Sequence, residues 1–285
     1  VARVAAGEAL LFPHAGTALT RRVINAIERA GAVHDANDDD VSREPIDAAS
    51  LAPLLHEALV RTASPLAIDL LLEQPERWGR AWSARGTDAA MVLPAEGAAT
   101  LRRLIDPPLV VAIGPPNIGK SSLLNALCGR SVSVVADEPG TTRDHVGALV
   151  NLAGLTVRFV DAPGIGRVAA EGAAESALQR ASQTLAVSTA RTADLLLWCG
   201  DAASGFLADP APSAVLGGID RVRVALRSDL GPAAGPADIA VSARTGEGIG
   251  DLVEAIRERL VPVRWRADPR AWRFWGPRAA SPDVP

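Results

Sequence analysis

Lysine is almost absent from this chain, and cysteine and long apolar runs are scarce. The 29 basic residues include one lysine, Lys120, and the rest are arginines. The two cysteines, Cys128 and Cys199, lack metal-ligand spacing, so a reduced, cytoplasmic protein is expected. No apolar run reaches the roughly 20 residues that span a bilayer, and no signal peptide is visible, so no membrane partner is expected. The net charge of -4 gives no general attraction to nucleic acid.

The first 107 residues divide into two predicted units. Residues 1–40 are typical of the end of an α/β domain, with a short strand at 9–12 and a helix at 17–30. Residues 41–107 are expected to form a helical domain, because apolar residues recur there at helical spacing. Within this domain, Ser64 followed by Pro65 predicts a helix start with Ser64 as its N-cap.

After two consecutive prolines, the pattern changes to short apolar strands that alternate with helices. This alternation predicts an α/β domain over residues 108–260, with a mostly parallel sheet and helices on both faces. The expected strands are 109–113, 155–160, 195–199, 222–226 and 239–241, with an antiparallel edge strand at 147–152. The expected helices are 121–127, about 173–192, and 250–260.

The tail, residues 261–285, is rich in arginine and tryptophan. Its interleaved aromatics and arginines are Arg264, Trp265, Arg266, Arg270, Trp272, Arg273, Phe274 and Trp275. Such a pattern suits stacking on RNA bases, and it suits equally the covering of an apolar face or of a partner protein. The sequence leaves these alternatives open.

The strand at 109–113 leads into a phosphate-binding signature. Residues 114–121 read Gly-Pro-Pro-Asn-Ile-Gly-Lys-Ser, which is the G-x-x-x-x-G-K-S pattern between a strand and a helix. The glycines let the backbone curl so that its N–H groups and the helix N-terminus face a phosphate chain. Lys120 is expected to reach the β- and γ-phosphates, and the Ser121 hydroxyl to ligate Mg²⁺.

Three further signals favour a GTPase over a P-loop kinase. Asp161-Ala162-Pro163-Gly164 follows a strand, where the Asp is expected to hold a Mg²⁺ water and the Gly N–H to sense the γ-phosphate. Thr142, within residues 140–144, is expected to complete the Mg²⁺ shell. Ser242-Ala243-Arg244 follows a strand and is suited to present backbone N–H groups to guanine. A kinase would explain neither residues 140–144 nor residues 242–244.

These motifs together resemble the TrmE/Era branch of small GTPases, most closely the TrmE (MnmE) tRNA-modification GTPases. The match covers about residues 109–260, and residues 14–31 faintly resemble the end of that family's folate-binding domain. The resemblance implies that Asn117 binds K⁺ near the phosphates. It also implies a switch-II glutamate as the catalytic group, with Glu171 and Glu175 as candidates, because Ile165 stands where Ras-like enzymes carry glutamine.

The resulting site prediction has three groups of residues. The nucleotide-binding group is Gly114, Asn117, Ile118, Gly119, Lys120, Ser121, Ser122, Asp229, Ser242, Ala243 and Arg244. The metal ligands are Ser121, Thr142 and Asp161 for Mg²⁺, and Asn117 for K⁺. The catalytic group is Lys120, Thr142, Gly164, Glu171 and Glu175.

The chain departs from the family at the guanine-reading motif, usually Asn-Lys-x-Asp. Here the register gives Leu226-Arg227-Ser228-Asp229, so Asp229 still accepts from guanine and Arg227 is able to stack on the base, but Leu226 makes no hydrogen bond. The chain also ends without the family's C-terminal cysteine motif, which favours another role than tRNA modification.

The expected function is hydrolysis of GTP to GDP and phosphate with Mg²⁺, assisted by K⁺, in a switch that dimerises through its G domains. The alternative is a nucleotide-binding scaffold with little or no hydrolysis, which Leu226 and the unassigned glutamate favour. RNA is a weaker expectation for a partner.

Overall fold

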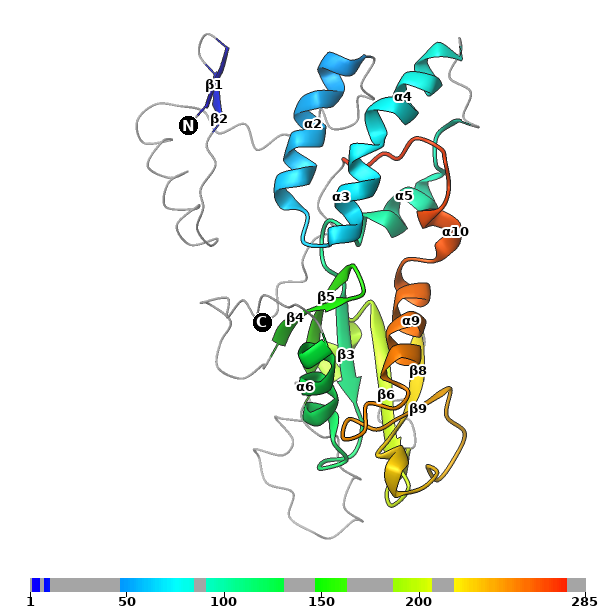
Figure 1. The fold of residues 1–285 in the computed structure, drawn as a ribbon. Coiled ribbons are helices and arrows are strands. Elements are labelled where there is room, and N and C mark those ends of the chain that lie inside the picture. The colour runs from blue at the N-terminus through cyan, green and yellow to red at the C-terminus, as the bar shows by residue number, and fades with distance from the viewer. Residues whose placement is uncertain are drawn as a thin grey trace.

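The computed structural model describes residues 2–5, 8–10, 47–84, 91–130, 147–162, 187–206 and 218–275. Figure 1 shows a group of helices stacked on the end of a seven-stranded sheet. A separate hairpin pairs β1 (Ala2–Ala5) with β2 (Glu8–Leu10) near the N-terminus. The helix predicted at residues 17–30 lies outside the described residues.

The large sheet has the predicted, mostly parallel arrangement. Its strands are β3 (Leu109–Ile113), β4 (Gly147–Leu152), β5 (Leu155–Asp161), β6 (Leu195–Asp201), β7 (Gly205–Phe206), β8 (Arg221–Leu226) and β9 (Ile239–Val241). The order is β4-β5-β3-β6-β8-β9, and β7 pairs with β6. The central pairs are parallel, while β4 runs antiparallel to β5 at the edge, as predicted.

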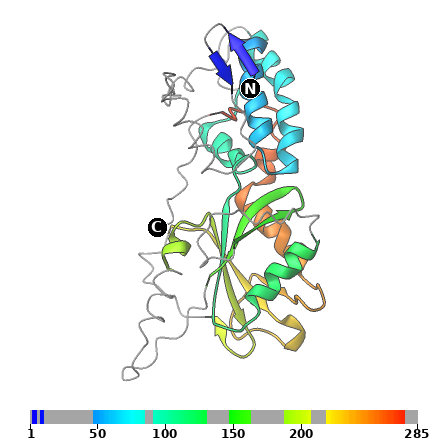
Figure 2. The ribbon, with the colours of Figure 1, turned by 90° about the vertical axis from the view of Figure 1, so that its left-hand side faces the viewer.

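Helices pack against this sheet, and the predicted fold class is confirmed. The described helices include α2 (Ala48–Arg61), α3 (Pro65–Leu72), α4 (Gln74–Ser83), α5 (Ala95–Arg102), α6 (Lys120–Arg130), α9 (Ile249–Leu260) and α10 (Val263–Arg266). Figure 2 shows α6 and α9 on one side of the sheet. Among these described elements, no helix has the length and apolar character needed to cross a bilayer.

Alternate residues of the central strand β3 pack into the two apolar layers, one on each face of the sheet. Val110 and Ala112 of β3 pack in the layer that includes α6 and α9, whereas Val111 packs in the layer that includes Ala190. This alternation follows from the two-residue period of a strand, and burial on both faces explains why β3 is a continuous apolar run. Ala190 belongs to helical residues 187–191, and the rest of the helix predicted at 173–192 lies outside the described residues.

The helical region is bonded to the hairpin that joins β4 to β5. The fully buried Ser64 accepts a hydrogen bond at Oγ from the Thr156 N–H (3.0 Å), and Thr156 Oγ1 donates to Ala63 O (2.8 Å). The N–H of Leu66 donates to Gly154 O at 3.1 Å. Ser64 is the N-cap residue of α3, as predicted, but its hydroxyl bonds to the β5 backbone and not to the helix. The sheet and the helices form one continuous packed structure.

Residues 261–275 return from the sheet to the helical region. Trp272 is fully buried, its N–H donates to Gln74 Oε1 (2.8 Å), and its indole Nε1 donates to Ala98 O (3.2 Å). Trp78 Nε1 in turn donates to Trp272 O (3.2 Å). Of the alternatives left open for the aromatic tail, Trp272 and the buried Phe274 therefore cover an apolar face.

Replacing Trp272 by alanine is expected to lower the free energy of unfolding by about 3–5 kcal/mol, because it empties a fully buried site. The change also leaves Ala98 O without its indole donor. Urea denaturation followed by circular dichroism measures the loss. Val263→Ala, at a residue that is 54% exposed, is the control and is expected to stay within about 0.5 kcal/mol. Equal effects of the two changes would contradict the role of Trp272.

Candidate functional site

The predicted motifs meet at one edge of the sheet. The parallel strands β3, β5, β8 and β9 all end there, and their ends carry Gly114, Asp161, Leu226 and Ser242. Ligands of open α/β sheets bind in the crevice beyond the carboxyl ends of the strands. The topology therefore places the phosphate motif and the base motif next to each other.

The loop between β3 and α6 has the tight backbone that its sequence predicts. A Cβ atom at Gly114 would lie 2.4 Å from Cys199 O, so only glycine fits against β6 at this position. Gly119 has φ +103° and Asn117 has φ +62°. Asparagine is one of the few non-glycine residues that adopt this left-handed conformation readily. The loop therefore curls so that its main chain leads directly into the N-terminus of α6.

Lys120, the first residue of α6, is held inside this loop. It is only 6% exposed, and its Nζ donates to Pro115 O (2.8 Å) and Gly114 O (3.2 Å). Burial lowers the pKa of the Lys120 ammonium, and the negative charge of Asp161 offsets part of this effect. Burial also raises the pKa of the neighbouring Cys199 thiol to about 12, so that thiol is neutral and unreactive at physiological pH.

Ser121 and Asp161 bring together two oxygen groups of the kind that a magnesium ion binds. The Ser121 hydroxyl donates to Asp161 Oδ2, so the two side chains meet at one point beside Lys120. Mg²⁺ prefers oxygen ligands and is usually held by one or two carboxylates together with phosphate oxygens. In the described part of the chain there is no cluster of three or more His, Cys, Asp or Glu side chains that would hold a metal alone. Ser121 and Asp161 therefore suit a metal ion that phosphate oxygens also coordinate.

Four of the predicted catalytic residues lie outside the described residues. They are Thr142, Gly164, Glu171 and Glu175. Their predicted roles therefore remain predictions.

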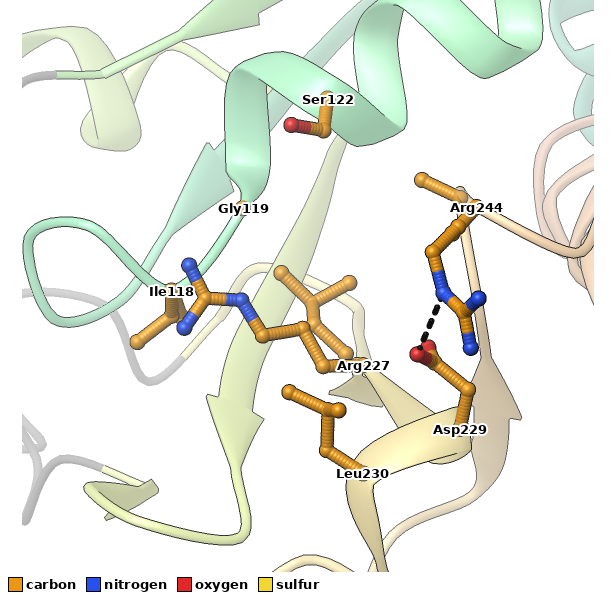
Figure 3. A pocket seen from close by; sticks show the side chains of 9 residues that line it. Ile118, Gly119, Ser122, Arg227, Asp229, Leu230 and Arg244 are labelled. Carbon is orange, nitrogen blue, oxygen red and sulfur yellow. Dashed lines mark hydrogen bonds and ion pairs between the residues drawn. The ribbon is translucent and has the colours of Figure 1, made fainter.

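The predicted base-reading end is organised around Asp229, in the 3₁₀ helix η3 (Ser228–Leu230). Asp229 Oδ1 accepts from Ser242 Oγ (2.5 Å), and Oδ2 accepts from Arg244 Nε (2.9 Å), as Figure 3 shows for the arginine. These bonds, first that from Ser242 and then that from Arg244, lower the pKa of the Asp229 carboxyl. Asp229 is thus an oriented carboxylate with lone pairs left for a ligand, since each oxygen is able to accept more than one hydrogen bond.

A cavity of about 250 Å³ joins the two ends of the site. It is lined by Ile118, Gly119, Ser122, Leu226, Arg227, Asp229, Leu230, Ala243 and Arg244. Six of these belong to the predicted nucleotide-binding group, and they come from the phosphate loop, α6, η3 and the turn after β9. The structure therefore brings the two predicted halves of the nucleotide site together.

The sequence interpretation missed Asp201, at the end of β6. Its buried carboxylate accepts from the N–H groups of Ala203 (3.1 Å) and Ser204 (2.7 Å), and it pairs with Arg227 Nη1 (3.5 Å). Arg227 also donates through Nη2 to Asn117 O. Asp201 thereby anchors an arginine that reaches from β8 to the phosphate loop. The available signal was an acidic residue two positions after the predicted end of the strand at 195–199.

Comparison with known proteins shows which proteins this part of the chain is similar to. Residues 109–218 match the family model described as "50S ribosome-binding GTPase". The tRNA modification GTPase MnmE of Acidiphilium cryptum is 44% identical over 151 residues, which cover 53% of this chain and 32% of that protein. An MnmE of Thermus thermophilus is 41% identical over 150 residues, covering 52% of this chain and 32% of that protein. The chain thus spans about a third of the length of the curated relatives it matches.

A solved structure of Era from Aquifex aeolicus, bound to GDP.AlF4-, is 26% identical, with a TM-score of 0.40. The match covers 54% of this chain and 56% of that chain. Taken together, the sequence matches confirm the predicted resemblance to the TrmE/Era GTPases. They also confirm that the α/β domain beginning at Leu109 is a P-loop GTPase domain.

Proposed function

We propose that this chain, whose α/β domain is a P-loop GTPase domain, binds GTP with Mg²⁺ and hydrolyses it to GDP and phosphate. The observation that carries the proposal is the convergence of Lys120 and Asp229 from two distant motifs on one sheet edge. A phosphate loop alone would suit many nucleotides. The oriented carboxylate beside the same cavity restricts the base to one with hydrogen-bond donors on its edge, which guanine has.

Residues of the phosphate loop stabilise the transferred group. Lys120 is a buried point charge at the N-terminus of an 11-residue helix, so cation and helix dipole act on the same side. The bonds from Lys120 Nζ to Pro115 O and Gly114 O are able to exchange for phosphate oxygens, to which the ammonium is more strongly attracted. Negative charge that develops on the phosphates during hydrolysis is stabilised in place.

Ser121 and Asp161 hold the magnesium ion in this proposal, together with Thr142. When bound, Mg²⁺ neutralises charge on the β- and γ-phosphates. The N–H of Gly164 senses the γ-phosphate, and Glu171 or Glu175 orients the attacking water. GTP and GDP are the ligands, and a homodimer through the G domains in the cytoplasm is part of the same proposal.

The hydrolysis step is tested by single-turnover GTP cleavage with the purified chain in Mg²⁺. Release of phosphate that requires Mg²⁺ supports an enzyme. Tight GTP binding without phosphate release supports the second candidate, a nucleotide-binding scaffold, which the apolar Leu226 in the pocket favours. Failure to bind any guanine nucleotide contradicts both.

Hydrolysis is expected to be at least about tenfold faster in KCl than in NaCl, because a cation beside the phosphates acts as an arginine finger does. Asn117 is exposed in the phosphate loop, and its amide oxygen is a ligand of the kind that suits K⁺. The Asn117→Gly variant removes that oxygen and keeps the left-handed backbone of φ +62°. The Asn117→Ala variant removes it with added strain.

Both variants are expected to lose the K⁺ effect. The same rates are measured for each variant in the two salts, with GDP affinity as the control for an intact loop. If K⁺ still stimulated hydrolysis in the Asn117→Gly variant, the proposed role of Asn117 as a K⁺ ligand would be contradicted.

A further inference from the structure

The cavity that we assign to the nucleobase has an apolar wall where β8 ends. Figure 3 shows Asp229 and Arg244 together on one side, and Ile118 with the guanidinium of Arg227 on the other. Leu226 and Leu230 complete the apolar part of the lining. A base whose donor edge faces Asp229 therefore also meets an apolar wall, of which Leu226 is part.

Leu226 is a fixed part of this apolar wall. It is the last residue of β8, it is only 3% exposed, and it belongs to the main apolar core. It stands three residues before Asp229 and lines the same cavity. An isobutyl group donates no hydrogen bond, so no acceptor of the base is bonded by the side chain at this position.

The guanidinium of Arg227 is engaged at both of its terminal nitrogens. Its two terminal nitrogens point to Asn117 O and to the buried Asp201, which hold it across the phosphate loop. An arginine fixed in this way offers its flat face to a purine ring, by stacking and cation–π attraction. The β8 end of the cavity therefore supplies shape and stacking to the base.

Guanine has donors at N1 and N2 and an acceptor at N7, on opposite edges of the purine. Asp229 accepts from the N1 and N2 edge, which leaves the imidazole edge to the rest of the lining. We propose that this pocket does not read N7 of guanine. Its ligands would then include guanine nucleotides that lack the N7 acceptor, such as 7-deazaguanine nucleotides. This inference rests on the proposed function, since it assumes that the cavity holds the base of a guanine nucleotide.

The test compares the binding of GDP and 7-deaza-GDP to the full chain in Mg²⁺, by isothermal titration calorimetry. The two ligands differ in one ring atom and present the same N1 and N2 donors. Affinities that agree within about twofold support the proposal, because one neutral hydrogen bond is worth roughly two- to tenfold. A loss of more than about twofold for 7-deaza-GDP overturns it. Absence of binding by GDP itself contradicts the proposed function instead.

The Leu226→Asn variant supplies the donor that the wall lacks. It is expected to prefer GDP over 7-deaza-GDP by about two- to tenfold, whereas Leu226→Met, the matched apolar control, is expected to show no preference. An Asn variant that binds both ligands equally would show that position 226 does not face the imidazole edge, and would overturn the proposal. Should the Asn variant fail to fold, the ratio for the unchanged chain decides alone.

Discussion

Replacing Lys120 by alanine is expected to weaken GTP binding by at least about 100-fold and to abolish hydrolysis. Removal of one donor aimed at developing charge typically costs about 10²–10³ in rate, and this donor carries a full charge in a buried position. Equilibrium binding of fluorescent GTP in Mg²⁺ measures the first effect, and phosphate release measures the second. Thermal unfolding of the variant checks that the loop change has not unfolded the domain.

Lys120→Arg is the sharper comparison, because it keeps the positive charge. The lysine is almost fully buried, and its ammonium fits between Pro115 O and Gly114 O. A planar, forked guanidinium is larger and does not fit the same position. We therefore expect the arginine variant to be nearly as impaired as the alanine variant. An arginine variant with normal GTP binding would show that charge alone is required here, and that survival of one lysine among the many arginines has no structural reason.

Local sequence patterns predicted the elements that local physics determines. The bounds of β3 and β9 agree with the predicted strands at 109–113 and 239–241, because each is a short apolar run between turn-forming residues. The phosphate loop was predictable for the same reason. Its glycines, its asparagine and its lysine are fixed by backbone geometry within a short stretch of chain, and the structure shows the left-handed angles that they allow.

Features that depend on distant partners were not predictable in this way. Gln74 and Trp272 are 198 residues apart, and nothing in either segment indicates the other. Ser64 followed by Pro65 satisfies the local rule for a helix cap. The Ser64 hydroxyl nevertheless accepts its hydrogen bond from the Thr156 N–H, 92 residues away. Asp201 and Arg227 lie far apart in the sequence, and the pairing of β6 with β8 brings them together. In each case tertiary structure overrode or completed a local signal.

The base-reading carboxylate gives the second large expected effect, in the Asp229→Asn variant. Guanine presents two donors to Asp229, whereas the Asn amide offers one acceptor and two donors. Losing charge-assisted hydrogen bonds, each worth about 1.5–3 kcal/mol, is expected to weaken GTP binding by about 100-fold or more. Ser242 and Arg244, which now orient the carboxylate, would also bond a neutral amide less strongly.

The Asp229→Asn variant should form with xanthine the hydrogen bond that it cannot form with guanine. Xanthine carries a carbonyl oxygen, which accepts from the Asn amide, where guanine carries the N2 amino group. The Asp229→Asn variant is therefore expected to bind xanthosine triphosphate more tightly than GTP, the reverse of the unchanged chain. Competition of both nucleotides against fluorescent GDP or XDP measures the order. Asp251→Asn, which removes one exposed carboxylate from the first turn of α9, is the charge-matched control and should leave GTP preferred. If Asp229→Asn kept its preference for GTP, the cavity beside Asp229 would not be the base site, whatever the phosphate loop binds.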